Sequence, residues 1–180
     1  MTDEQILDRV ASTLGDAGAT WSLGGAAAAA GLHSATLIKR FGSRHALLVA
    51  LSRRWVDGIP TAPTTVDGHR ELLAWIDSLS THGSTQVQLL ARLDMVVEDL
   101  RDPELRDLLH KGWQRHLRYL SALVDRAQRA GQISSAAPSP LVAQLLLDSA
   151  HGSLLRAAVA PDPTEADPAH AVHNLLETLR

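Results

Sequence analysis

The fold can be inferred outward from residues 22–47, which read SLGGAAAAAGLHSATLIKRFGSRHAL. Ser22 is a favourable N-cap for a short helix, and Gly31 stands where a tight turn needs a left-handed backbone. Residues 34–41 predict a second short helix, which ends just before Ser43, the N-cap of a third. Two short helices around a glycine-containing turn predict a helix-turn-helix motif.

The second of these helices has two different faces. Leu37 and Phe41 lie four residues apart and give it one buried side. The side chains left outside are short or basic, which suits a helix that lies in a DNA major groove. They are Ser34, Ala35, Thr36, Lys39 and Arg40.

Charge is distributed unevenly along the chain. The net charge is −3 at pH 7, yet residues 1–55 carry six bases against four acids. Five of those six bases lie between Lys39 and Arg54. A basic end on an acidic body indicates a polyanion partner at that end, although five such bases could also form an ordinary solvated helix face.

Composition excludes several classes of protein. The 180 residues contain no cysteine, which excludes a disulfide scaffold, a zinc–thiolate site and cysteine catalysis. The acidic start at Asp3 and Glu4 leads into a helical pattern and does not resemble a signal peptide. No apolar run reaches the roughly 18 residues of a membrane span. We therefore expect a cytoplasmic location.

The remaining sequence predicts helices throughout. Aromatic residues make up only 3% of the chain, and no long stretch alternates between apolar and polar residues as a strand would. Thr2 and Gln5 predict a capping box at the first helix, which we expect Gly18 to end. Three later helices should each begin with an N-cap followed by proline, at Asp102-Pro103, Ser139-Pro140 and Asp167-Pro168.

The predicted fold is therefore all-α, in two parts. We expect a three-helix helix-turn-helix domain over residues 1–50 and an antiparallel helical domain over residues 51–180, with a proline-rich connection at residues 58–65. In the second part, one helix should run from Pro103 to Gly131, a length of about 40 Å.

Residues 6–51 resemble the DNA-binding domain of TetR-family transcriptional regulators. The family pattern reads apolar-x-x-Ile-Ala-x-x-Ala-Gly-Val-Ser-x-x-Thr-Leu-Tyr-x-x-Phe-x-Ser-Lys-x-x-Leu, and Arg44 keeps the charge of its lysine. The positions that match in register are Ala27, Ala30, Gly31, Thr36, Leu37, Phe41, Ser43 and Leu47. The resemblance implies a ligand-responsive homodimeric regulator and no enzyme, most simply a repressor that binds a palindromic DNA operator and is released by a small-molecule effector. It implies no cofactor and no metal.

The chain departs from that pattern at several positions. Ile38 replaces a tyrosine whose hydroxyl binds a phosphate, and His33 replaces a serine that is a better N-cap. Ala26 replaces a core isoleucine, while Gly24 and Gly25 each cost a helix up to ~1 kcal/mol relative to alanine. We therefore expect a DNA-binding domain that is loosely folded without its operator.

The resemblance also implies which residues contact DNA. Ser22 and Arg44 should hold phosphates, Lys39 should reach base edges together with Ser34 and Thr36, and Arg40 should contact a phosphate or a base. The complete candidate set is Ser22, His33, Ser34, Ala35, Thr36, Ile38, Lys39, Arg40 and Arg44.

The second domain should bind the effector and form the dimer. Candidate effector contacts are large, polarizable or polar side chains on helices expected to face one another, namely Trp75, Arg92, Met95, Trp113, His116, Leu117 and His151. The last two helices combine small and apolar residues, which would let the helices of two subunits approach closely. The candidate interface residues are Leu145, Ser149, Gly152, Leu155, Val172, Leu175, Leu176 and Leu179.

Two other functions remain open from the sequence. One is a helical metal-binding enzyme, for which His170 and His173, three residues apart, are the best candidate ligands. No His-Glu-x-x-His, di-iron, phosphate-loop, dinucleotide or nucleophile-elbow motif supports it. The other is a helical adaptor that has lost sequence-specific DNA binding, to which the changes at Ile38 and His33 point.

Overall fold

The computed structural model describes residues 1–14, 22–81 and 84–179 of the 180-residue chain. Over these residues the fold is all-helical, with nine α-helices, one short 3₁₀ helix and no strand, which confirms the predicted class. The helices belong to two compact units. The first unit comprises Met1–Gly58 and Ser84–Gly112, and the second comprises Ile59–Gly83 and Trp113–Arg180.

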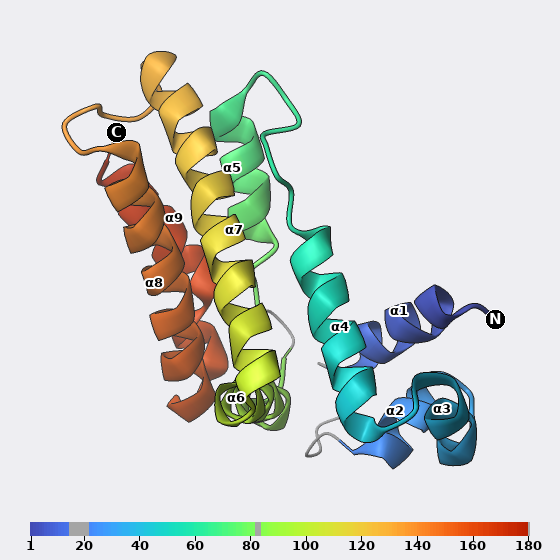
Figure 1. Cartoon of the computed structure of the whole chain (residues 1–180). Coiled ribbons are helices and arrows are strands. Elements are labelled where there is room, and N and C mark those ends of the chain that lie inside the picture. The colour runs from blue at the N-terminus through green and yellow to red at the C-terminus, as the bar shows by residue number, and fades with distance from the viewer. Residues whose placement is uncertain (15–21, 82–83, 180) are drawn as a thin grey trace. The chain divides into compact units, whose positions relative to one another are not determined.

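The first unit contains the N-terminal helices together with one later helix and the beginning of another. It holds α1 (Asp3–Leu14), α2 (Leu23–Ala29), α3 (Ser34–Phe41), α4 (Arg44–Gly58), α6 (Gln86–Arg101) and the beginning of α7 (Pro103–Arg129). Contacts join α1 to α2, α2 to α3, and α4 to both α1 and α3 (Figure 1). The predicted motif therefore forms α2 and α3.

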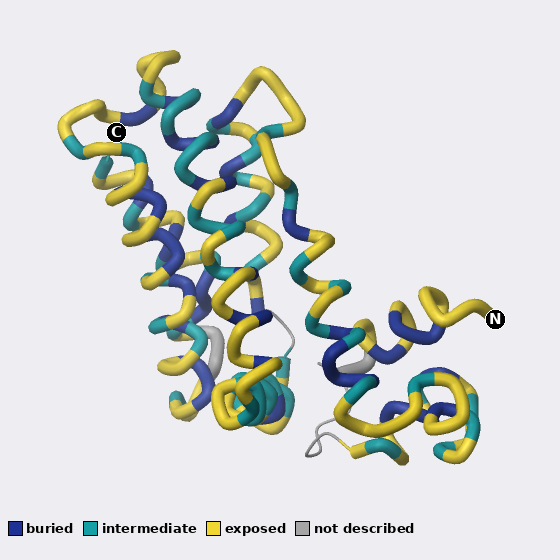
Figure 2. The backbone as a smooth tube through the Cα atoms, viewed as in Figure 1, coloured by how far each residue is buried: buried dark blue, intermediate teal, exposed yellow. Residues whose placement is uncertain are grey.

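Small side chains let the helices of this unit approach closely. Ala26 and Ala27 on α2 and Ala30 at its C-cap pack with Ile6 and Val10 of α1, and all five are buried. Figure 2 draws the buried parts of these two helices in dark blue. Because alanine adds only one methyl group beyond the backbone, α1 and α2 meet with little side-chain material between them. The core is correspondingly thin and holds less apolar surface than larger side chains would provide.

The other side of α4 packs on the beginning of α7. Leu48 and Val49 of α4 form a small cluster with Leu105 and Leu108 of α7. One turn further along α7, the backbone at Gly112 meets the ring of Trp55, where an added Cβ would lie 2.0 Å from a ring carbon. Glycine at position 112 is thus required by this contact between α4 and α7.

The second unit is a helical bundle with a larger core. It comprises α5 (Gly68–Asp77), the remainder of α7, α8 (Ser139–Val159), the 3₁₀ helix η1 (Pro163–Ala166) and α9 (Pro168–Glu177). Figure 1 shows α5, α7 and α8 running side by side. Its fully buried side chains come from all four α-helices and include Leu72, Ile76, Leu120, Leu123, Leu146, Val172 and Leu176.

Most predicted helix starts are confirmed. Thr2 and Gln5 form their reciprocal capping bonds, at 3.2 and 2.8 Å. Asp102 caps α7, and Asp167 caps α9 by accepting the His170 backbone N–H. The start of α8 is displaced by one residue, because Ser139 is already helical and Pro138 is the N-cap with no side-chain bond.

Two of the sequence expectations remain predictions. Gly18, the expected end of the first helix, lies outside the described residues. The division into functional domains at residue 50 also stays a prediction, since compactness groups α6 and the start of α7 with the N-terminal helices. None of the helices in the described ranges has the length and apolar character that crossing a membrane requires.

Candidate functional site

Backbone and side-chain bonds shape the turn between α2 and α3. The Ser22 hydroxyl oxygen accepts the Gly25 backbone N–H at 3.0 Å and so caps α2. Gly31 has a φ of 66°, and the next amide, that of Leu32, donates to the Ala27 carbonyl at 2.8 Å. This bond closes the helix end around a left-handed residue, which glycine adopts without strain.

Helix α3 presents the predicted DNA-contacting residues on its outer side. Leu37 is fully buried, which fixes the orientation of the helix about its axis. His33 caps α3 through its backbone only, with no side-chain hydrogen bond, as its weak capping ability predicts. Of the remaining candidates, Ala35, Ile38, Lys39 and Arg40 are exposed, and Ser34 and Thr36 are half-buried.

The exposed bases of this surface differ in their partners. Arg40 forms an ion pair with Asp3, with 2.7 Å between Nε and Oδ1, and donates to the Met1 carbonyl at 2.9 Å. Lys39, on the same helix, has no ion-pair partner in the described part of the chain. Of the two bases on α3, Lys39 can therefore bind a nucleic acid without breaking an ion pair within the chain, whereas Arg40 cannot.

Arg44, at the start of α4, is held by a carboxylate from α6. Both of its terminal nitrogens donate to Glu98, one to each carboxylate oxygen, with 2.8 Å between Nη2 and Oε2. The pair is partly exposed, at 43% for the arginine side chain and 32% for the glutamate. A bidentate arginine–carboxylate pair is the stronger and more directional form of ion pair.

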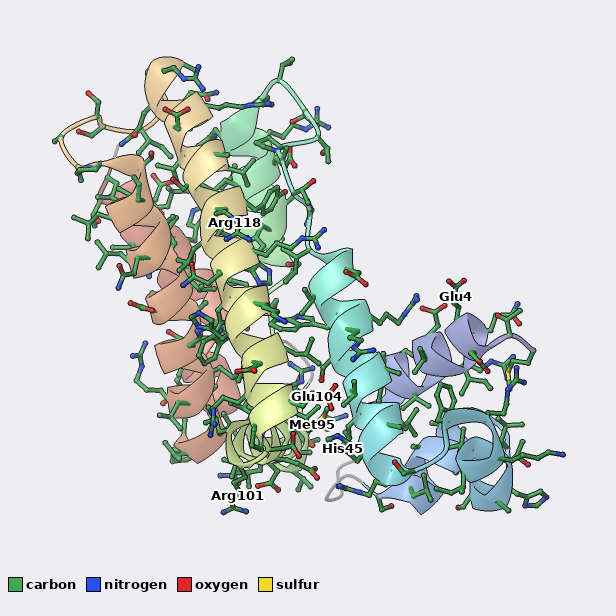
Figure 3. All side chains as sticks on the ribbon, viewed as in Figure 1. Glu4, His45, Met95, Arg101, Glu104 and Arg118 are labelled. Atoms are coloured by element: carbon green, nitrogen blue, oxygen red, sulfur yellow. The ribbon has the colours of Figure 1, made fainter. Side chains whose placement is uncertain are left out.

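The same edge of α4 contacts the beginning of α7. His45 places Nε2 3.2 Å from Glu104 Oε2 and Nδ1 3.5 Å from Asp102 Oδ2. Arg53 donates to the other oxygen of Glu104 at 3.1 Å. Figure 3 shows His45 and Glu104 extending toward each other from the two helices. Arg44, His45 and Arg53 of α4 thus pair with Glu98, Asp102 and Glu104, and we call this group of pairs the charged seam.

The acids of this seam crowd one another. Burial raises the pKa of Asp99 to about 6, and the neighbouring charges of Glu98 and Asp102 add to the effect. The acids opposite the bases of α4 were not among the residues predicted from the sequence. The signal was present, because Glu98, Asp99, Asp102 and Glu104 place four acids within seven residues.

The predicted effector residues are divided between the two units. Arg92 and Met95 are half-buried on α6 of the first unit. In the second unit, Trp75 and Leu117 pack against the bundle core, as partly buried side chains. The remaining three, Trp113, His116 and His151, come from α7 and α8 of the second unit.

Trp113 and His151 form the clearest side-chain cluster among these candidates. Their ring centroids are 5.5 Å apart, and the rings are tilted by 47°. Desolvation lowers the pKa of His116, with a further contribution from His151, and desolvation also lowers the pKa of His151 against the opposing charge of Asp148. Both imidazoles are therefore predominantly neutral at pH 7, and each can donate one hydrogen bond and accept another.

The predicted interface residues fall into two groups. On α8, Leu145 and Leu155 are exposed, at 43% and 56%, and Ser149 and Gly152 are partly exposed between them. Leu175 on α9 and Leu179 just after it are half-buried, and Val172 and Leu176 of α9 are fully buried in the core of their own unit. The last two side chains consequently do not lie on the surface of the unit.

The histidines considered as metal ligands lie on α9. His170 and His173 are both exposed, and His173 Nε2 lies 3.7 Å from Glu177 Oε1 of the following turn. Among the described residues, no three histidine, aspartate or glutamate side chains are grouped closely enough to hold a metal ion. The structure does show an open depression elsewhere, lined by Val66, Arg126, Arg129 and Ala130, none of which was a predicted contact.

The C-terminal part of the chain matches a known protein family. Residues 68–180 match the C-terminal domain family of BetI-type transcriptional repressors, which is more than half of the sequence. No curated protein matches the chain by sequence.

Several solved structures share the fold. A TetR transcription regulator from Haloarcula marismortui is 19% identical, with a TM-score of 0.72 over 98% of this chain and 96% of that one. A TetR transcriptional regulator from Streptomyces coelicolor is 24% identical, with a TM-score of 0.65 over 99% and 98%. A transcriptional regulator from Saccharomonospora viridis, solved in complex with choline, is 16% identical, with a TM-score of 0.69 over 97% and 94%.

Proposed function

The chain belongs to the TetR family of transcriptional regulators, and on that premise we propose that it is a homodimeric repressor that binds a palindromic DNA operator and is released by a small-molecule effector. The observation that carries the proposal is the geometry of α3. Its buried Leu37 directs a row of short and basic side chains outward, at the position of a recognition helix.

The residues of α2 to α4 divide into two kinds of DNA contact. Lys39, Ser34 and Thr36 would reach base edges, while Ser22 and Arg44 would hold phosphates on either side of the groove. Ser22 caps the first turn of a helix and can still donate its hydroxyl proton. Ile38, which is 37% exposed, would offer only an apolar contact, for example to a thymine methyl group.

The dimer would form through α8. Its exposed face carries Leu141, Leu145, Leu155 and Val159, at 48%, 43%, 56% and 69% exposure, and Ser149 and Gly152 lie between the two pairs. A Cβ added at Gly152 would have no contact nearer than 3.8 Å within the chain, so its absence leaves room for a partner helix. Leu175 and Leu179 would border the interface, and we leave Val172 and Leu176 out of it because they are buried.

The effector would bind beside Trp113, His116 and His151. Two neutral imidazoles and an indole ring offer an apolar surface with a few hydrogen-bonding groups, which is the usual composition of a small-molecule site. Because the regulator from Saccharomonospora viridis holds choline, a quaternary ammonium compound is the first effector to test. The face of Trp113 could bind such a cation.

Effector binding would act by shifting a population. An effector that binds better to the form of the dimer that does not fit the operator lowers operator affinity by the ratio of its two affinities. Arg92 and Met95 remain candidate effector contacts on α6, in the unit that also contains α3 and α4.

Selection of bound sequences from a random duplex library at physiological salt tests the proposal. We expect an enriched palindrome, and ~10-fold weaker binding to it by Lys39→Ala, whose loss removes a base contact. Lys111→Ala is the matched control, because it removes the same charge from an exposed position on α7. Binding without any enriched sequence would contradict the proposal and favour the adaptor alternative.

A further inference from the structure

The contact between Arg44 and Glu98 joins the proposed DNA surface to α6. Arg44 is the base at the N-terminus of α4 that the family resemblance assigns to a DNA phosphate. In the structure its two terminal nitrogens both donate to Glu98. Glu98 is on the last turn of α6, three residues after Met95, so it lies one helical turn from a proposed effector contact.

A carboxylate and a phosphate compete for the same groups of an arginine. Each presents a pair of oxygens to which the guanidinium fork donates two parallel hydrogen bonds. The fork that Arg44 gives to Glu98 is therefore not available to a phosphate at the same time. Binding of DNA through Arg44 requires the ion pair to open.

The acidic residues around Glu98 also repel the phosphates of DNA. Asp99, Asp102 and Glu104 lie on the same α6–α7 corner, and opening of the Arg44 pair would leave a fourth negative charge there. His45 and Arg53 offset part of that charge by pairing with Asp102 and Glu104. A phosphate that approaches Arg44 therefore approaches an acidic corner.

We propose that Glu98 acts as an intramolecular substitute for a DNA phosphate on Arg44, so that the DNA-free chain keeps this contact closed and operator binding must displace it. The proposal rests on the proposed function.

The test is the affinity of Glu98→Gln for its operator and for a random duplex, measured by fluorescence anisotropy over a range of salt. Glutamine keeps the size of the side chain and removes the charge. We expect both affinities to rise about fivefold, the size of one partly exposed ion pair. In the wild type, DNA binding would free the Glu98 carboxylate, which then takes up a cation from solution. The variant has no such carboxylate, so the slope of log affinity against log salt should steepen by up to about one counterion.

Two further variants separate this competition from a general effect of charge. Glu104→Gln removes one negative charge from the same corner, but its partners are Arg53 and His45, which are not proposed DNA contacts. It should strengthen binding by less than twofold. In an Arg44→Ala background, Glu98→Gln should strengthen binding no more than Glu104→Gln does, since the arginine for which Glu98 competes is gone.

Each outcome supports or overturns the proposal. Equal gains in Glu98→Gln and Glu104→Gln, or weaker binding by Glu98→Gln, overturn it, while the proposed function stands if the wild-type chain binds its operator. No binding by wild type or variants, even at low salt, overturns the proposed function and this inference with it. If Glu98→Gln does not fold, Glu98→Asp replaces it, because the shorter side chain keeps the charge but weakens the bidentate pair, and unchanged affinity then overturns the proposal.

Discussion

Carboxylates stabilise the two units in different ways, each through contacts within its own unit. In the second unit, Asp167 is only 4% exposed and accepts the Thr81 backbone N–H at 2.7 Å and the Thr81 hydroxyl at 3.1 Å. Glu71 likewise accepts the backbone N–H groups of Thr64 and Thr65. In the first unit, by contrast, Glu98 and Asp3 pair with arginines at the surface.

The contrast shows which contacts can be exchanged. A backbone N–H that loses a buried carboxylate has no substitute partner, so breaking the bond costs the full desolvation of the group. An exposed arginine that loses a carboxylate can turn to water or to a phosphate at little net cost. The bonds of buried Asp167 should therefore resist exchange, whereas the surface pairs of Glu98 and Asp3 can open and re-form.

Asp167→Ala should cause the largest loss of stability among the variants considered. The change removes the cap of α9 and leaves the Thr81 N–H and hydroxyl without their acceptor, so the free energy of unfolding should fall by ~3 kcal/mol. Urea denaturation at pH 7 measures it. Asp107→Ala, which removes an exposed acid from α7, is the control and should cost less than 0.5 kcal/mol, within the usual range of about ±0.5 for surface changes.

The pH dependence of that loss follows from the pKa. Burial alone would raise the pKa of Asp167, but the N–H groups of Thr81 and His170 and the Thr81 hydroxyl bond the charged form and lower it below the ordinary value of 3.8. The stabilisation is therefore present above pH 4 and is lost as the pH falls through the lowered pKa. The difference between Asp167→Ala and wild type should shrink in acid, and a constant difference would contradict the bonding described here.

Asp99→Asn should act in the opposite direction, in the first unit. Because burial and the charges of Glu98 and Asp102 raise the pKa of Asp99 to about 6, ionised Asp99 opposes folding, and the penalty grows as the pH rises from 4 through 6. Allowing for its partial exposure, the asparagine variant should be more stable by ~1 kcal/mol at pH 7.5 and no more stable at pH 4. Thermal denaturation at the two pH values tests this, and a lower melting temperature at pH 7.5 would show that the carboxylate supports the fold.

Much of the first unit could be predicted because its signals are local. Ser22, Gly31 and Leu37 determine a cap, a turn and a buried face through bonds within a few residues, and the structure places all three as expected. The predicted N-cap of α8, Ser139, was wrong by one residue. Pro138, Ser139 and Pro140 are all common at helix starts, and apolar periodicity does not show which of them is the N-cap.

The contacts that depend on distant parts of the chain could not be predicted. Arg44 and Glu98 are 54 residues apart, and no periodicity connects them. An apolar stripe also does not show what covers it. On α9 the stripe includes Val172 and Leu176, which the chain's own core buries, whereas on α8 it includes Leu145 and Leu155, which remain exposed. Only the packing of the bundle distinguishes the two cases.

Gly24→Ala tests how firmly α2 is held in the first unit. Gly24 is exposed in the first turn of α2, and an added Cβ there comes no nearer than 3.9 Å to the Ser22 hydroxyl. Alanine should therefore stabilise α2 by about 0.5 kcal/mol, chiefly by restricting the unfolded chain. In the DNA-free wild type we expect the amide hydrogens of α2 and α3 to exchange with solvent faster than those in the middle of α7. In the Gly24→Ala variant, exchange should become slower in α2 and α3 and stay unchanged in α7.

Gly25→Ala is the matched control for that measurement. Its Cβ would lie 3.3 Å from the same hydroxyl oxygen, which Gly25 itself binds through its backbone N–H, so strain at the cap offsets the gain. Slower exchange in α7 as well as in α2 would mean that the two units unfold together. Slower exchange confined to α2 and α3 would mean that the proposed recognition helix opens independently. The smaller core of its unit and its exchangeable ion pairs would then hold it less firmly than the larger core and buried Asp167 hold the bundle.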